Sequence, residues 1–161
     1  MHPTNEEHKP LYLEDLQVGQ RFSSGHYQID EAQIKAFARE FDPQPFHLDE
    51  TAAEHSFFNR MVASGWHTAA ATMRLLVEGE LRLAQGVIGL GGEIAWPKPV
   101  RPGDTLRVES EILEIRPSRS RTDRGVVIVR SATVNQNGDQ VQVFTGKLLV
   151  FKRGADAITP L

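Results

Sequence analysis

The chain has 161 residues, of which 40% are hydrophobic and 24% charged, and its formal net charge is −3. These values predict a single globular domain over residues 1–161 that binds small molecules, and they argue against a nucleic-acid partner. The sequence contains no cysteine, which excludes disulfides, thiolate metal sites and cysteine nucleophiles.

The first thirty residues carry few signals for regular structure. Residues 1–10 are polar and resemble neither a signal peptide nor a membrane anchor, so we expect a flexible N-terminal arm. Residues 21–29 are compatible with a lead-in strand. The most apolar window, residues 61–77, contains several polar side chains and is too short to span a membrane. We therefore expect a cytoplasmic protein with no membrane partner.

A helix is predicted to begin after Asp30. Gln33 follows three residues later, which is the spacing of a capping box. Pro43 disfavours helical geometry at Asp42, so the helix should end there. Its apolar positions recur at helical spacing and predict one buried stripe: Ile34, Phe37, Ala38 and Phe41.

Two more helices are expected before the second half of the chain. Asp49 can cap a short helix over residues 50–54. A longer helix should begin at Gly65 and fray at Gly79. It has the composition of a buried core helix, and one face is marked at helical spacing by Trp66, Ala70, Met73 and Val77.

The second half of the chain has the pattern of β-strands. Apolar, β-branched runs cover residues 87–96, 106–115, 126–134 and 141–151. Asn137-Gly138 favours a tight antiparallel hairpin between the last two runs. Residues 89–92 are glycine-rich but lead into a strand, so we interpret them as a bulge and not as a dinucleotide-binding loop. Consecutive strands after one apolar helix predict an α+β fold in which an antiparallel sheet curls over that helix.

A carboxylate and an imidazole flank a rigid turn at Asp42-Pro43-Gln44-Pro45-Phe46-His47. Two prolines restrict the backbone between Asp42 and His47, which would help both side chains to face one water molecule. Gly65 at a helix start could present a free N–H to a developing oxyanion. A purely structural reading remains open here, with Asp42 as a turn residue, His47 at the surface and Gly65 in an ordinary turn.

The residues Asp42, Pro45, His47, Ala63 and Gly65 resemble the motif of the MaoC-like dehydratase, or (R)-specific enoyl-CoA hydratase, family. The resemblance covers roughly residues 15 to 152 and includes the segment 99–104. It implies a hot-dog fold, which is a curved antiparallel sheet wrapped around a central α-helix. It also implies a homodimer or a higher homo-oligomer.

The same resemblance implies a hydro-lyase that adds water to, or removes it from, an α,β-unsaturated acyl thioester. Asp42 would take a proton from water, His47 would hold that water and help to protonate the α-carbon, and the Gly65 N–H would stabilise the thioester oxygen. The substrate would be a thioester of coenzyme A or acyl carrier protein, with no cofactor and no metal. Residues implied in substrate binding are Pro45, Ala63, Ser64 and Trp66.

Several points stay open at this stage. Efficient base catalysis would need burial to raise the pKa of Asp42. Trp66 could limit the depth of the acyl tunnel or fill the core, and His67 could line the tunnel or lie in the core. The arginine cluster over residues 116–124, like Lys98 and Arg101, could bind coenzyme A phosphates or be solvated.

Two other functions compete with the hydro-lyase. A hot-dog acyl-CoA thioesterase would place its carboxylate on the core helix, where Glu78 and Glu80 are the candidates. A non-catalytic acyl-binding subunit would keep the fold alone. Six histidines are present, but they lack the paired spacing of zinc ligands.

Overall fold

The computed structural model describes residues 9–155 of the chain. The expected N-terminal arm falls almost wholly outside this range. The framework is an antiparallel six-stranded sheet with the strand order β1-β4-β5-β6-β3, and β2 also pairs with β4. Its strands are β1 (Arg21–Ser23), β2 (Tyr27–Gln28), β3 (Ile88–Ala95), β4 (Thr105–Pro117), β5 (Arg124–Val134) and β6 (Gln140–Phe151).

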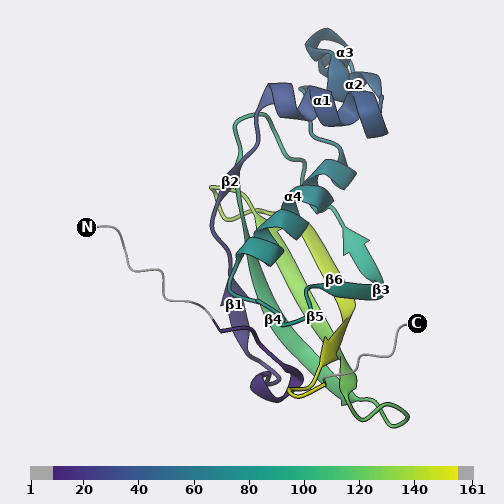
Figure 1. Ribbon diagram of the computed structural model, residues 1–161. Coiled ribbons are helices and arrows are strands. Elements are labelled where there is room, and N and C mark those ends of the chain that lie inside the picture. The colour runs from purple at the N-terminus through teal and green to yellow at the C-terminus, as the bar shows by residue number, and fades with distance from the viewer. Residues whose placement is uncertain (1–8, 156–161) are drawn as a thin grey trace.

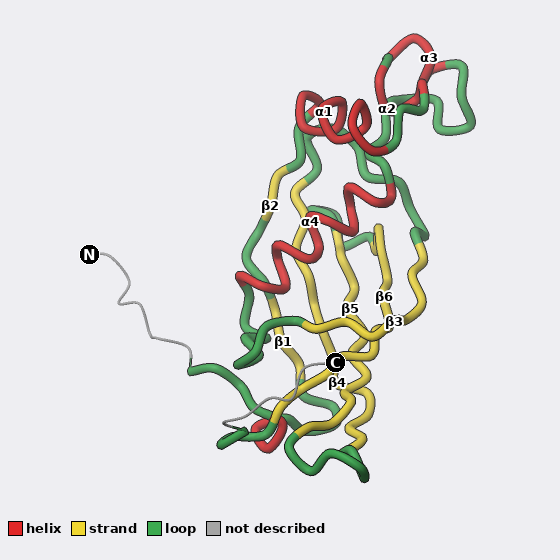
Figure 2. Tube along the Cα trace, turned by 45° about the vertical axis from the view of Figure 1, so that its right-hand side comes forward, coloured by secondary structure: helices red, strands yellow, loops and turns green. Residues whose placement is uncertain are grey.

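The helices divide into one on the sheet and a group at its end. Helix α4 (Gly65–Glu78) crosses one face of the curved sheet, as Figures 1 and 2 show. Three shorter helices gather beyond one end of the sheet, next to the start of α4 (Figure 1). They are α1 (Glu31–Phe41), α2 (Pro45–Leu48) and α3 (Glu50–Glu54), and a single 3-10 turn, η1 (Leu13–Asp15), precedes β1. The predicted α+β fold, with a curved sheet around one helix, is confirmed.

The local signals in the sequence set the limits of α1. Its N-terminus has both capping-box hydrogen bonds, from Gln33 N to Asp30 Oδ1 at 2.8 Å and from Asp30 N to Gln33 Oε1 at 2.9 Å. Asp42 is the C-terminal cap, as the following proline predicts. The predicted buried stripe is only partly right, because Phe41 is 64% exposed whereas Ile34 and Ala38 are fully buried.

Helix α2 was not predicted, because the sequence indicated only a rigid turn in this segment. Pro45 occupies its first position, where the missing N–H costs no hydrogen bond and the fixed φ suits a helix. The segment between Asp42 and His47 therefore consists of a short turn followed by the first residues of α2. Helix α3 begins after Asp49, whose side chain accepts from Ala52 N at 2.7 Å, as predicted.

Helix α4 packs on the sheet with a different face from the one expected. The buried side consists of His67, Thr68, Ala71, Thr72 and Leu75. A hydrogen bond of 2.6 Å joins the Thr72 and Thr133 hydroxyls across the helix–sheet interface. The predicted core face is exposed instead, with Trp66 at 60%, Met73 at 45% and Val77 at 55%. Helix α4 therefore has two apolar faces, and the rest of the chain covers only the face that packs on the sheet.

The strands match their predicted ranges to within a few residues. Gly138 adopts a φ of +80° in the turn between β5 and β6, which suits the Asn137-Gly138 hairpin. A bulge interrupts β3 between Gly89 and Gly91, as the glycine-rich run suggested. The single lead-in strand was wrong, because residues 21–29 form two short strands. Within residues 9–155, no helix is long and apolar enough to cross a membrane.

Candidate active site

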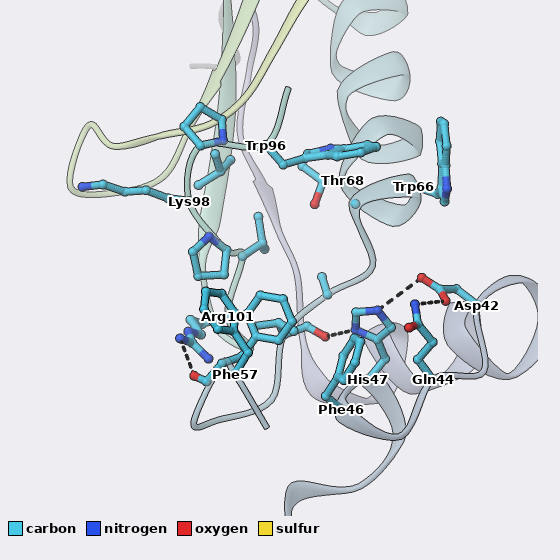
Figure 3. A pocket seen from close by; sticks show the side chains of 18 of the residues that line it. Asp42, Gln44, Phe46, His47, Phe57, Trp66, Thr68, Trp96, Lys98 and Arg101 are labelled. Atoms are coloured by element: carbon cyan, nitrogen blue, oxygen red, sulfur yellow. Dashed lines mark hydrogen bonds and ion pairs between the residues drawn. The ribbon is translucent and has the colours of Figure 1, made fainter. Parts of the chain in front are cut away.

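A cavity of about 580 Å³ lies where the helices α1 and α2 meet the start of α4 and the segment that follows β3. Figure 3 shows the side chains that line it. We call its buried lining residues the floor, and its exposed lining residues mark the opening. The floor consists of His47, Val62, Ala63, Thr68, Val100 and Val141. This is the usual character of a small-molecule site, which is concave and largely apolar with a few polar groups.

Asp42 and His47 meet at this cavity (Figure 3). Asp42 Oδ2 lies 3.2 Å from His47 Nε2. Asp42 caps the C-terminus of α1 and His47 is in α2, so the short α1–α2 connection sets their distance. The two side chains thus face one another at the cavity, as the rigid turn predicted, and His47 is only 4% exposed.

The second ring nitrogen of His47 is also engaged. Nδ1 lies 2.6 Å from the carbonyl oxygen of Val62. A carbonyl can only accept, so Nδ1 must carry a proton and donate it. Nε2 can then donate to Asp42 only when the ring is an imidazolium, and the neutral ring presents a lone pair there. The pair is therefore built to hold one mobile proton between Nε2 and the carboxylate.

The environment of Asp42 keeps its carboxylate charged. Burial alone would raise the pKa of Asp42, but hydrogen bonds from Ser64 and Gln44 and the adjacent His47 outweigh burial. The pKa of the Asp42 carboxyl consequently lies below its ordinary value. The Gln44 bond joins Nε2 to Asp42 Oδ1 at 2.8 Å. The expectation of a raised pKa is therefore wrong in the structure described, because polar neighbours replace the water that burial removes.

Gly65 begins α4 at the edge of the same cavity. Its N–H belongs to the first helical turn, which has no intrahelical acceptor. Ser64 caps this helix by accepting from Trp66 N at 3.2 Å. Because the Trp96 indole lies against Gly65, a Cβ at this position would come within 2.7 Å of the ring. Glycine is therefore required here by packing as well as being compatible with a donor role.

The residues expected to bind substrate fall into two groups. Ala63 and Trp66 line the cavity. Pro45 and Ser64 do not: Pro45 starts α2, and Ser64 is buried as the cap of α4. These two residues position Asp42, His47 and Gly65 instead of forming the wall. Trp66 does not fill the core, since 60% of it is exposed.

Sequence reasoning missed several residues of the cavity wall. Trp96, Phe57, Thr68 and Val141 all line it. Phe57 is 93% exposed at the opening, which is unusual for a phenylalanine. The one available signal was Trp96, a large aromatic residue at the end of the predicted strand 87–96 and directly before a proline. The others come from elements that only the tertiary fold brings together.

The cationic residues separate into two places. Lys98 and Arg101 line the cavity, and Lys98 Nζ pairs with Asp139 at 2.7 Å. The Arg101 guanidinium donates to the carbonyls of Arg60 at 2.9 Å and Phe58 at 3.0 Å, so it also holds the loop at the opening. The arginine cluster over residues 116–124 lies at the β4–β5 hairpin tip, at the end of the sheet away from the cavity (Figure 1).

The remaining candidates lie away from the cavity. Glu78 pairs with Arg74, and Glu80 accepts from the backbone and hydroxyl of Ser23, so neither carboxylate reaches the wall. His67 is a core residue, stacked on Phe37 with ring centroids 4.7 Å apart. Burial lowers the pKa of His67. In residues 9–155 no group of three or more metal-ligating side chains occurs.

Comparisons with known proteins add to this geometry. The family described as "MaoC like domain" matches residues 15–136. The chain is 58% identical to the MaoC-like dehydratase from Rhodospirillum rubrum, whose crystal structure superposes with a TM-score of 0.88 over 94% of this chain and 99% of that one.

Two curated relatives also match over most of their length. The uncharacterized protein YdeM of Bacillus subtilis (strain 168) is 34% identical over 141 residues, which is 87% of this chain and 97% of that protein. A 3-hydroxybutyryl-CoA dehydratase of Methylorubrum extorquens is 31% identical over 145 residues, which is 89% of this chain and 85% of that protein.

Proposed function

Because this chain belongs to the MaoC-like domain family and has its hot-dog fold, we propose that it is a hydro-lyase acting on an α,β-unsaturated acyl thioester. Its reaction would be that of an (R)-specific enoyl-CoA hydratase, or in reverse a 3-hydroxyacyl-CoA dehydratase. The observation that carries this proposal is the contact of 3.2 Å between Asp42 Oδ2 and His47 Nε2 at the cavity. The activity of the Methylorubrum relative is of the same class.

The arrangement supports a balanced sequence of proton transfers. Asp42 removes a proton from water, and the water oxygen forms a bond to the β-carbon. The π electrons of the double bond then form a bond from the α-carbon to a proton that leaves His47 Nε2. The proton held by Asp42 returns to His47 across their contact, so the pair ends in its starting state.

Gly65 would act on the opposite end of the conjugated system. Charge moves to the thioester oxygen as water adds to the β-carbon, and an N–H at a helix start stabilises such charge. Removal of a comparable donor costs about 3–4 kcal/mol of transition-state stabilisation in other enzymes. Lys98 and Arg101, at the opening, are suited to the phosphates of a coenzyme A or acyl-carrier-protein thioester.

A thioesterase is less well supported, because its candidate carboxylates Glu78 and Glu80 lie off the cavity. The distinguishing experiment incubates the purified protein with a short trans-2-enoyl-CoA. Hydration removes the absorbance of the conjugated thioester and leaves coenzyme A esterified, and the product is an (R)-3-hydroxyacyl thioester. Release of free thiol would identify a thioesterase. A folded protein that binds the thioester without either change would be a non-catalytic subunit.

We also propose that the functional unit is a homodimer. An apolar stripe formed by Trp66, Ala70, Met73 and Val77 runs along α4 without cover in the single chain. The neighbouring strand β3 is a sheet edge, and edges are common sites of pairing. Trp96, directly after β3, contacts Trp66 with ring centroids 5.3 Å apart, so the edge and the stripe are continuous. A second copy would cover both by twofold symmetry.

A further inference from the structure

Trp96 occupies a distinctive place in the cavity wall. It directly follows β3 and reaches across to the start of α4. Figure 3 shows it across the cavity from His47 and Phe46, while Trp66, which also lines the cavity, projects from the start of α4 above Asp42. The two indoles touch nearly edge to face, at an interplanar angle of 81°, and both line the cavity.

The orientation of the Trp96 indole is fixed by two contacts. One face lies on Gly65, close enough that even a methyl group there would meet the ring. Its Nε1 donates to Gln142 Oε1 at 3.0 Å, and Gln142 is only 2% exposed. A buried amide oxygen that lost this donor would be left unsatisfied, so the bond is costly to break. These two contacts hold the indole in one orientation, although 40% of Trp96 is exposed.

The floor next to this wall is suited to an acyl chain. Val141 and Val100 are buried and apolar, and Val141 precedes Gln142 in β6. The neighbouring Thr68 hydroxyl lies 3.4 Å from the Ser64 carbonyl within the helix, so this hydroxyl has an acceptor inside the protein. With the reacting carbons at Asp42 and His47 and the thioester oxygen at Gly65, an acyl group would lie between this apolar floor and the indole, which packs on Gly65.

We propose that Trp96 is the residue that limits acyl length, so that the enzyme takes short-chain thioesters. The inference rests on the proposed function, because it places the reacting carbons at Asp42 and His47. It assigns the length limit to the tryptophan held by Gln142 and not to Trp66, the tryptophan that the sequence singled out beside Gly65.

The test compares two chain lengths in four proteins. For wild type, Trp96→Ala, Trp96→Phe and Trp66→Ala, kcat/KM is measured for trans-2-butenoyl-CoA and trans-2-octenoyl-CoA. Binding of saturated butyryl-CoA and octanoyl-CoA is measured in parallel by calorimetry, which requires no turnover. Trp66→Ala is the comparison variant, since it removes an indole of the same size from the other member of the contacting pair.

Trp96→Ala should raise the octenoyl-to-butenoyl ratio of kcat/KM by about tenfold or more, the scale on which a hydrophobic pocket discriminates by size. Trp96→Phe, which keeps an aromatic ring against Gly65, should shift the ratio in the same direction by less. Trp66→Ala should shift the ratio by less than Trp96→Ala does. The binding ratios should follow the same order.

Distinct outcomes would overturn the two proposals. If folded Trp96→Ala and Trp96→Phe keep the wild-type ratios in catalysis and in binding, or if Trp66→Ala shifts them as much, Trp96 does not set the limit. Should Trp96→Ala fail to fold, Trp96→Phe alone decides. If the wild type hydrates no enoyl thioester, the hydro-lyase proposal fails, while the binding ratios still decide the role of Trp96. A wild type that binds no acyl-CoA contradicts both.

Discussion

His47 Nδ1 lies 2.6 Å from the carbonyl oxygen of Val62, a residue fifteen positions further along the chain. This contact fixes the ring across the cavity floor and determines which nitrogen can exchange a proton with Asp42. We predict that the neutral ring of His47 carries its proton on Nδ1. Nitrogen-15 NMR of histidine-labelled protein would show it as a protonated nitrogen. A spectrum in which His47 carries its only proton on Nε2 would contradict this assignment.

The lowered pKa of Asp42 predicts how pH acts on activity and stability. Burial opposes the shift, but hydrogen bonds from Ser64 and Gln44 and the nearby His47 prevail. The carboxylate should therefore remain a base until the pH falls below its ordinary value of 3.8. Its contribution to the free energy of unfolding should be complete above that value and should disappear as the pH falls through the lower, folded-state pKa.

Urea unfolding of wild type and Asp42→Asn at several pH values between 7 and 3 measures this contribution. The difference in free energy of unfolding between the two proteins should shrink at the acid end of the range. A difference that grows as the pH falls would mean that the folded state raises the pKa of Asp42.

The contact between Gly65 and Trp96 predicts the effect of a single methyl group. Gly65→Ala places a Cβ within 2.7 Å of the Trp96 ring, so the indole must move. We expect a loss of about 1–3 kcal/mol of stability from overpacking, measured by urea unfolding, together with a change in tryptophan fluorescence.

Gly25→Ala is the matched control for this variant, because nothing lies within 4 Å of a Cβ at that position. It should be close to wild type in both measurements. Equal stability and unchanged fluorescence in the two variants would show that Trp96 does not pack on Gly65 as described.

The proposed homodimer makes a prediction about the α4 stripe. Met73→Asp puts a charge at the centre of the stripe on a side chain that is already 45% exposed. The single chain should still fold, but sedimentation should show half the wild-type mass, since a buried unpaired charge is strongly unfavourable. Val18→Asp, at a site 65% exposed and off α4, should sediment like the wild type. A monomeric wild type would reject the dimer.

The elements that the sequence predicted well are those with local signals. The Asp30–Gln33 capping box, the glycine start of α4 and the Asn137-Gly138 hairpin each depend on residues close together in the chain. The face of α4 was wrong because periodicity identifies an apolar stripe but not whether the same chain covers it. Helix α2 was missed because its four residues are too few for a periodic pattern.

The residues of the site show the same difference between local sequence signals, which could be predicted, and tertiary contacts, which could not. Asp42, His47 and Gly65 stand in recognisable motifs, and the structure brings them to one cavity. Trp96 and Gln142 are 46 residues apart and gain their roles only through the pairing of β3 with β6. The direction of the Asp42 pKa shift also depended on a tertiary contact, because Ser64 lies 22 positions from Asp42 in the sequence.

The contact between Asp42 and His47 is tested most directly by steady-state hydration of trans-2-butenoyl-CoA by wild type, Asp42→Asn and His47→Ala. General acid–base groups contribute about 10²–10⁴-fold to rate, so each variant should lose at least about 10²-fold in kcat/KM while circular dichroism stays like that of the wild type. If the wild type hydrates the substrate and folded Asp42→Asn does so at the same rate, Asp42 is not the catalytic base and the proposed role of the Asp42–His47 pair is contradicted.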